Sequence, residues 1–150
     1  MRVVIQRVSK ASISVYGEVK NSIKQGLLIL LGIEESDDLE DISWLCKKIA
    51  QLRIFSDDQG LVNSSILDVK GEALVVSQFT LHAKTKKGNR PSFMKAASSE
   101  QAIPLYKEFV KELEKKIGKA VKTGEFGANM QVSLCNDGPV TIIIDTKKKE

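Results

Sequence analysis

Four residues that directly follow an apolar segment are the first place where this sequence could do chemistry. Residues 73–76 (ALVV) have the composition of a buried strand, and Ser77-Gln78-Phe79-Thr80 comes immediately after them. Hydroxyl, amide and backbone N–H groups at a strand end can donate hydrogen bonds to the oxyanion of a reacting substrate. A plain strand end with a Ser/Thr turn explains the same residues equally well, so both interpretations stay open on these residues alone.

The sequence contains a single histidine, His82, which argues against a Ser/His/Asp triad and against a zinc site. A triad of Ser77, His82 and a distant aspartate lacks a GxSxG elbow, and residues five apart on a strand point to opposite faces. His82 is therefore expected on the surface after the strand. One histidine and two distant cysteines do not supply the usual zinc ligands, and the GxxxxGK[ST] and GxGxxG patterns are absent. No metal and no cofactor are expected.

A second polar segment, Asn136-Asp137-Gly138-Pro139, separates two apolar stretches near the end of the chain. These residue types are typical of a hairpin turn, which is the interpretation that composition favours. A functional interpretation is also open, because glycine lets backbone carbonyls approach a ligand closely and an X-Pro bond can be cis.

A short basic segment follows the first polar segment and contains Lys84, Lys86, Lys87 and Arg90. Taken alone, such a run is a solvated loop. Beside a candidate site it predicts a phosphate-binding rim, because flexible cations bind a nucleic-acid backbone without reading its sequence. The net charge of +4 is compatible with a polyanionic partner but is also common in proteins that have none.

Length and composition indicate one folded domain over residues 1–150. The chain is 42% hydrophobic and 28% charged, which is typical of a globular protein. Its longest apolar run, residues 26–33, is far shorter than the roughly 20 residues that span a bilayer, and no signal peptide is recognisable, so a cytoplasmic location without membrane contact is expected. Cys46 and Cys135 are both expected to be buried and unpaired.

Hydrophobic periodicity predicts the elements that must position these residues. Strands are expected over residues 1–8, 11–16, 53–56, 121–126, 130–134 and 140–144, with residues 26–33 as a central strand because that run is apolar without alternation. Lys147–Glu150 is expected to be a solvated tail. A helix is expected to start at Ser36, with Asp37 and Asp38 in its first turn. Its apolar stripe contains Leu39, Ile42, Leu45, Ile49 and Leu52, and Trp44 packs beside it.

A second helix is expected to begin at Ser98 or Ser99 and to end at Gly118, with Leu105, Phe109, Leu113 and Ile117 on one face. Pro104 fits only if the regular helix begins near Ile103, since a proline further inside removes a hydrogen bond. Together these elements predict an α+β fold: a mainly antiparallel sheet or partly closed β-barrel with two packed helices.

The motifs in their order and spacing resemble one family, the D-aminoacyl-tRNA deacylases, also called D-tyrosyl-tRNA deacylases. The resemblance runs from the opening MRVVIQRVSKASISV through SQFTL (77–81) and GNRPSF (88–93) to TGEFGANMQVSLCNDGPVTIIID (123–145). Each piece is weak alone, but their order over nearly the whole chain is specific. The SQxT and NxGPxT forms are both intact.

This resemblance implies a homodimeric, metal-free cytoplasmic hydrolase that cleaves the ester between a D-amino acid, or glycine, and the 3′ end of tRNA, and that spares L-aminoacyl-tRNA. It implies that Gly138-Pro139 is a cis pair that enters the active site of the other subunit and rejects L side chains by shape. Asn136, Thr141 and Met130 are implied to help form the substrate pocket.

The resemblance, taken with the residues present, also implies a mechanism for ester hydrolysis. Thr80 has no obvious base beside it in the sequence, so help from the 2′-hydroxyl of the terminal adenosine is expected, with the Phe79 N–H stabilising the oxyanion and Ser77, Gln78 and Thr80 shaping the pocket. Two alternatives stay open: a nucleic-acid-binding module without turnover, and an esterase that acts on another small acyl ester.

Overall fold

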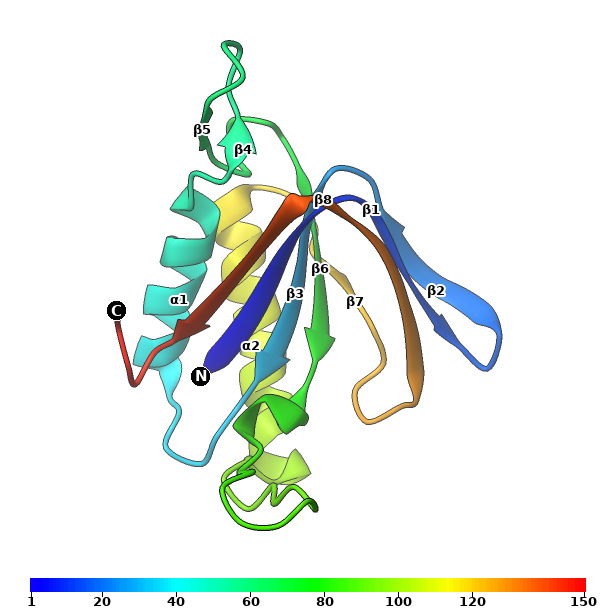
Figure 1. Ribbon diagram of the computed structural model, residues 1–150, viewed down its shortest axis with the longest axis vertical. Coiled ribbons are helices and arrows are strands. Elements are labelled where there is room, and N and C mark those ends of the chain that lie inside the picture. Colours follow the sequence, from blue (N-terminus) through cyan, green and yellow to red (C-terminus); the bar gives the residue numbers. More distant parts are fainter.

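The longest feature of the fold is an antiparallel ladder between β1 (Arg2–Val15) and β8 (Met130–Asp145). A computed structural model describes all residues from 1 to 150 and shows both strands bending together at the upper end of the sheet (Figure 1). The ladder runs from the pair Arg2–Asp145 to the pair Val15–Met130, and its register shifts between Gln6 and Lys10. The sequence predicted two short strands on each side of this ladder. Instead, β1 and β8 are each one long strand that continues through the bend.

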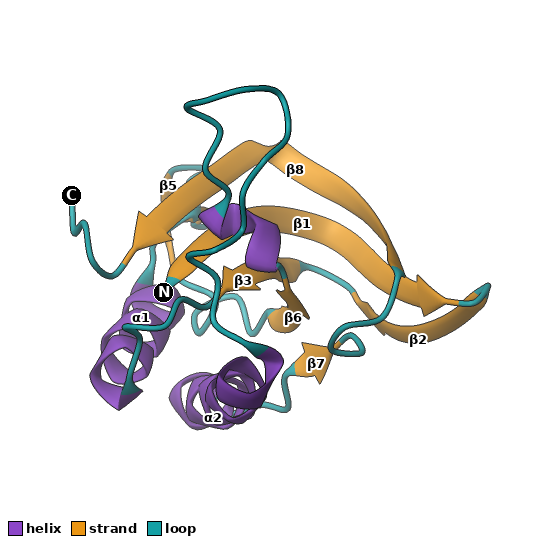
Figure 2. Cartoon of the chain, turned by 90° about the horizontal axis from the view of Figure 1, so that it is seen from below, coloured by secondary structure: helices purple, strands orange, loops and turns teal.

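The remaining strands complete a mixed sheet. Its order is β2 (Glu18–Ile23), β1, β3 (Gly26–Gly32), β6 (Glu72–Ser77) and β7 (Lys122–Thr123), with β8 paired to β1. β1 pairs antiparallel with β2, β3 and β8, whereas β3–β6 and β6–β7 are parallel. The sheet curls until it is nearly closed, which confirms the expected α+β class (Figure 2). β4 (Phe55–Ser56) and β5 (Val62–Ser64) form a separate small hairpin.

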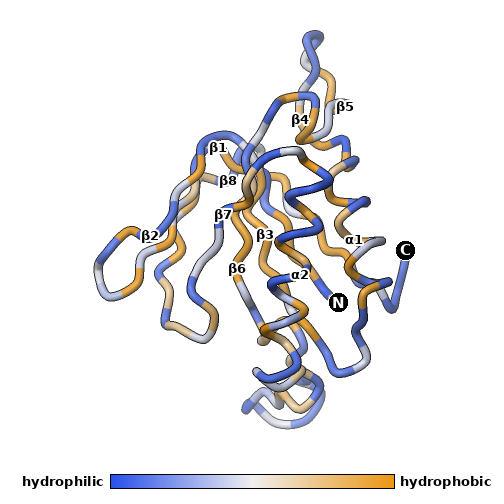
Figure 3. The backbone as a smooth tube through the Cα atoms, turned by 180° about the vertical axis from the view of Figure 1, so that it is seen from behind, coloured by the Kyte–Doolittle hydropathy of each residue, from blue (hydrophilic) through white to orange (hydrophobic).

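β3 lies at the centre of this sheet, as its apolar run predicts, and it fixes where β6 ends. All its residues except Leu30 are buried, and Figure 3 shows hydrophobic colouring along the middle of β3 and β6. A Cβ at Gly26 would lie 1.8 Å from the Glu72 carbonyl oxygen, so only glycine allows the two backbones to meet there. The parallel register then carries Ser77 level with Leu31.

Two helices cover one face of the sheet, α1 (Leu39–Gln51) and α2 (Ser99–Ile117) (Figure 2). Their buried residues join those of β1, β3 and β6 in one core cluster. Each large apolar side chain that is fully removed from water in such a cluster contributes roughly 1.5–3 kcal/mol of transfer free energy. Neither helix combines the length and the apolar character that crossing a bilayer requires.

The start of α1 differs from the sequence prediction, whereas α2 begins at Ser99 after the cap residue Ser98, as expected. Asp38, not Ser36, caps α1, because its carboxylate accepts from the N–H groups of Glu40 and Asp41. Leu39 is 63% exposed and does not belong to the apolar stripe. The regular helix was expected to begin only near Ile103, but it already begins at Ser99, so Pro104 lies inside α2. Its exposed position near the helix start leaves the carbonyl four residues back open to water.

Three further expectations are corrected. The strand expected over residues 121–126 is only Lys122–Thr123. Cys135 is exposed on β8, whereas Cys46 is buried as expected. The tail is not simply solvated, because Lys147 pairs with Asp41 at 2.7 Å and Lys149 lies 4.5 Å from the centre of the Trp44 ring.

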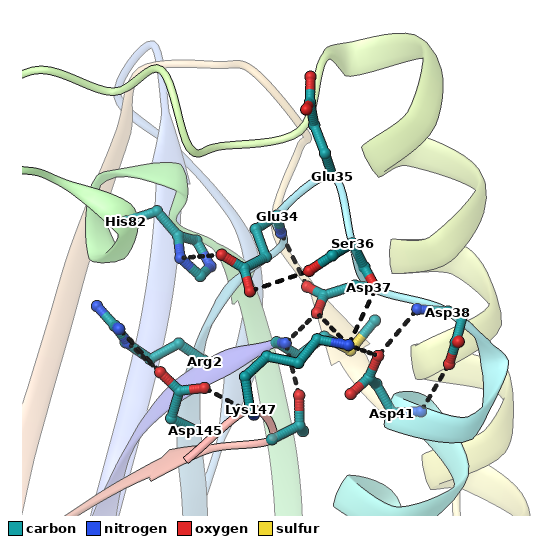
Figure 4. A network of polar contacts seen from close by, with 12 residues as sticks. Arg2, Glu34, Glu35, Ser36, Asp37, Asp38, Asp41, His82, Asp145 and Lys147 are labelled. Carbon is teal, nitrogen blue, oxygen red and sulfur yellow. Dashed lines mark hydrogen bonds and ion pairs between the residues drawn. The ribbon is translucent and has the colours of Figure 1, made fainter.

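A polar network joins the two chain ends to the start of α1 (Figure 4). The Met1 ammonium donates to Asp37 and to Thr146 Oγ1, and both charged groups are fully buried. Lys147 Nζ donates to Asp41 in the same network. Burial alone would raise the pKa of Asp41, but hydrogen bonds from Lys147, Thr146 and the Asp38 backbone outweigh it and lower this pKa to about 2.

The lowered pKa of Asp41 predicts acid sensitivity. Since the folded pKa lies below the unfolded value, the ionised group stabilises the fold fully above about pH 4, and this contribution is lost as the pH falls through 2. Denaturant unfolding from pH 5 to pH 2 should show a loss of about 2 kcal/mol more for the wild type than for Asp41→Asn. Parallel pH curves for the two proteins would contradict this assignment.

Candidate active site

A cavity of about 610 Å³ lies at the carboxyl end of β6 and contains most of the first polar segment. Ser77, Gln78 and Phe79 line it on one side, and Met130 lines it from the start of β8. The other walls come from the start of α2 and from the segment before β8; they include Ala96, Ala97, Ser98, Ala102, Phe126 and Asn129. An apolar cavity with a few polar groups at one edge is the usual form of a small-molecule site.

The end of β6 turns sharply and presents backbone donors. Gln78 N donates to the Leu31 carbonyl at 2.7 Å, which ties the strand end to β3. Residues Phe79–His82 then form a 3-10 turn, and the N–H of its first residue, Phe79, has no acceptor within the turn. This N–H is available to a developing oxyanion at the cavity edge.

Thr80 is exposed and is not part of the cavity wall. Its only hydrogen bond to another side chain is the one that it accepts from Gln78 Nε2 at 2.5 Å. An amide is not basic in either orientation, so it cannot take the hydroxyl proton. A nucleophilic Thr80 therefore lacks the base that such a mechanism requires.

His82 is buried rather than at the surface, which corrects the sequence prediction. Its side chain packs behind the turn at 3% exposure, and Nδ1 lies 3.8 Å from Glu34 Oε2. Ser77 faces the cavity while His82 faces Glu34, so the two do not form a catalytic pair.

The basic segment is attached to the cavity by an aromatic contact. Phe79 and Phe93 meet edge to face with ring centroids 5.1 Å apart, and both line the cavity. Backbone hydrogen bonds between Lys84 and Ser92 close the intervening loop. Within this loop the side chains of Lys84, Lys86, Lys87 and Arg90 are all exposed, and none of the four is in a salt bridge.

The second polar segment is a bulge in β8 and not a hairpin turn. Val8 pairs with Asn136 and Gln6 pairs with Thr141, so 137–140 protrude from the ladder. Asn136 Nδ2 donates to Gln6 Oε1 at 2.5 Å and to Thr141 Oγ1 at 3.3 Å, and Val140 N donates back to Asn136 Oδ1 at 3.1 Å. The Gly138-Pro139 bond is cis.

Within one chain, this bulge and the cavity are apart. The bulge occupies the apex of the β1–β8 ladder, whereas β6 ends at the opposite end of the sheet (Figure 1). None of Asn136, Gly138, Pro139 and Thr141 lines the cavity. Of the expected pocket residues, the structure therefore brings together Ser77, Gln78, Phe79 and Met130 only.

Arg7 supports the bulge and was missed by the sequence analysis. It is buried at 8% exposure, its Nε donates to the Asp137 carbonyl at 2.9 Å, and its Nη1 donates to the Ile54 carbonyl at 2.7 Å. The sequence contained a sign of this burial, because Arg7 alternates with Val3 and Ile5 along β1 and therefore lies on the same face as these core residues. A cation at a core position needs nearby acceptors, and the bulge provides one of them.

Known proteins resemble this chain along its full length. A model of the family described as D-Tyr-tRNA(Tyr) deacylase matches residues 4–145. Relatives named D-aminoacyl-tRNA deacylase from Bacteroides fragilis (strain YCH46) and Flavobacterium johnsoniae are 64% and 58% identical, each over 100% of both chains.

Solved structures show the same fold. The c-Myc DNA Unwinding Element Binding Protein superposes with a TM-score of 0.91 at 42% identity, over 97% of this chain and 98% of its own. A probable eukaryotic D-amino acid tRNA deacylase superposes with a TM-score of 0.82 at 17% identity, over 95% of this chain and 97% of its own.

The cavity at the end of β6, the nearly closed mixed sheet and the full-length relatives define this chain as a hydrolase of the deacylase class. The chain belongs to the D-Tyr-tRNA(Tyr) deacylase family. The resemblance found in the sequence is thereby confirmed.

The geometry of the bulge predicts that Gly138 tolerates no side chain. Gly138 has φ +136°, and a Cβ there would lie 2.9 Å from Val140 Cγ2 and 3.0 Å from Arg7 Nη2. Gly138→Ala should lower the free energy of unfolding by about 1–3 kcal/mol. Gly17→Ala is the matched control, because Gly17 also has positive φ but has no atom within 4 Å of its Cβ position. Equal losses in chemical denaturation would show that the contacts at Gly138 do not matter.

Proposed function

We propose that this protein hydrolyses the ester of D-aminoacyl-tRNA at a composite site built from two copies of the chain. The observation that carries the proposal is the separation within one chain of the cavity from the Gly138-Pro139 bulge. A two-fold dimer brings the same surface of both copies together, so the bulge of one chain can reach the cavity of the other. A cytoplasmic location is part of this proposal, because charged tRNA is used by translation there.

Chiral selection follows from such a composite site. The carbonyls of Gly138 and Pro139 would hold the α-amino group of the substrate, and a D side chain would then point into the cavity lined by Met130. An L side chain would collide with the bulge, whereas glycine has no side chain and would be accepted. Rejection of the wrong substrate by a steric clash is an effective source of specificity.

The reaction that we propose is the addition of water to the ester carbonyl. The Phe79 N–H stabilises the oxyanion, and the 2′-hydroxyl of the terminal adenosine helps activate the water. The bond to the ribose 3′-oxygen then breaks, the oxygen takes a proton, and the free D-amino acid and tRNA leave. Because the Thr80 hydroxyl has no neighbouring base to take its proton, attack by water is favoured over a covalent intermediate on Thr80.

The exposed lysines next to Phe93 are proposed to bind the tRNA backbone. Lys84, Lys86, Lys87 and Arg90 are free of carboxylate partners and follow the turn that lines the cavity. The loop between Lys84 and Arg90 contains no aromatic residue that could stack on bases. Recognition should therefore depend on charge and be sensitive to salt.

A second candidate is a nucleic-acid-binding module without turnover. It is favoured by the solved structure at 42% identity, whose name describes a DNA unwinding element binding protein. The enzyme remains the better proposal, because a protein that only binds a backbone needs no cavity beside its basic loop. An esterase for other small acyl esters would differ by retaining activity without tRNA.

The proposal predicts stereospecific hydrolysis. Purified protein should release D-tyrosine from D-tyrosyl-tRNA and leave matched L-tyrosyl-tRNA intact, with a metal chelator present throughout. Loss of both esters would keep the hydrolase and reject the chiral filter. Loss of neither, with tRNA still bound, would favour the binding module.

The role of Thr80 can be separated from that of the Phe79 N–H. Thr80→Ala should lower kcat by less than about tenfold, whereas Phe79→Pro, which removes a donor, should lower it by on the order of 100- to 1,000-fold. Single-turnover rates on D-tyrosyl-tRNA measure both effects. A fall of several orders of magnitude for Thr80→Ala would support a nucleophilic threonine instead.

The basic loop predicts the salt dependence of tRNA binding. Lys86→Gln/Lys87→Gln should weaken tRNA affinity at low salt and reduce the slope of log affinity against log salt by about 2, one for each lost phosphate contact. Lys107→Gln/Lys111→Gln changes the net charge equally on the exposed side of α2 and serves as the control. If both double variants bind alike, the loop is not the tRNA rim.

A further inference from the structure

The 3-10 turn Phe79–His82 rests on the end of β3 at Gly32. A Cβ at Gly32 would lie 3.0 Å from Gln78 O, directly before the turn, and equally close to Leu81 Cβ and His82 Cδ2 within it. The turn and the imidazole therefore fill the space that any other residue at Gly32 would need. The position of the Phe79 N–H depends on how this turn sits on β3.

His82 is buried in this packing at a cost to stability. Its Nε2 has no hydrogen-bond partner, and its Nδ1 faces Glu34 at 3.8 Å. A buried polar atom without a partner destabilises a fold, and an apolar residue would avoid that loss. Residues that oppose stability next to a reactive segment are commonly retained for function.

Glu34 connects this imidazole to the opposite wall of the cavity. Its backbone forms an antiparallel bridge with Ala96, and Ala97 N donates to the Ile33 carbonyl at 2.9 Å. Ala96 and Ala97 both line the cavity. Glu34 N also donates to Asp37 Oδ2 at 2.8 Å, which fixes its backbone to the buried network shown in Figure 4.

We propose that His82 and Glu34 form a positioning pair for ester hydrolysis: together they hold the Phe79–His82 turn at a fixed place relative to the Ala96–Ala97 wall. The pair touches neither substrate nor cavity and acts through the turn. This inference rests on the proposed function, since the turn carries the proposed oxyanion donor. Small displacements of a positioned group can lower the rate by on the order of 10- to 100-fold.

The test compares kcat and KM on D-tyrosyl-tRNA. His82→Leu should lower kcat by roughly 10- to 100-fold with little change in KM, because the basic loop still binds tRNA. His82→Asn places a polar atom where Nδ1 lies and should restore most of the rate. Glu34→Ala should match His82→Leu, and the double variant should be no worse than either single one, as expected for residues that act as a unit.

Cys46→Ala is the control for a change in the buried core, because Cys46 is buried between the helices away from the turn, and it should leave kcat unchanged whatever its effect on Tm. Wild-type kcat in His82→Leu, no rescue by His82→Asn, or multiplying effects in the double variant would each overturn the pair. If His82→Leu does not fold, an unchanged kcat in Glu34→Ala overturns it. An inactive wild type would instead reject the proposed function itself.

Discussion

The pairing of β1 with β8 is the interaction on which the rest of the structure depends. The bulge that carries Gly138 and Pro139 interrupts the middle of this ladder, where both strands bend. At the ladder end formed by Arg2 and Asp145, these two side chains bond to each other, and Arg2 Nη1 donates to the Leu81 carbonyl at 2.6 Å, in the turn that borders the cavity. A change in the ladder register would therefore displace both functional segments together.

Both functional segments are supported by a buried polar side chain and by a glycine that makes room for it. Arg7 holds the bulge beside Gly138, and His82 lies behind the turn at Gly32. The proposed oxyanion stabilisation and steric selection would both need rigid support of this kind, because a displacement of about 1 Å can lower a rate by on the order of 100-fold. The apolar core supplies stability, whereas these polar supports determine the geometry of the site.

Much of the fold could be predicted from local patterns. The apolar run of residues 26–33 identified the central strand, and helical periodicity located both helices to within a few residues. The end of α2 was predicted correctly, because Gly118 adopts the left-handed conformation with φ +67°. What local patterns missed depends on contacts across the chain. The sequence 136–139 has turn chemistry, but pairing with β1 keeps it within one strand, and the burial of His82 depends on Gly32, fifty residues earlier.

Whether one active site needs two chains is tested most directly by mixing two inactive variants. Phe79→Pro damages the cavity edge, and Gly138→Ala damages the bulge, so each homodimer should be inactive. After both are unfolded together and refolded as a mixture, mixed dimers contain one intact site, and about a quarter of the wild-type activity per site should return. A mixture as inactive as its parents, although mixed dimers have formed, would contradict the composite site.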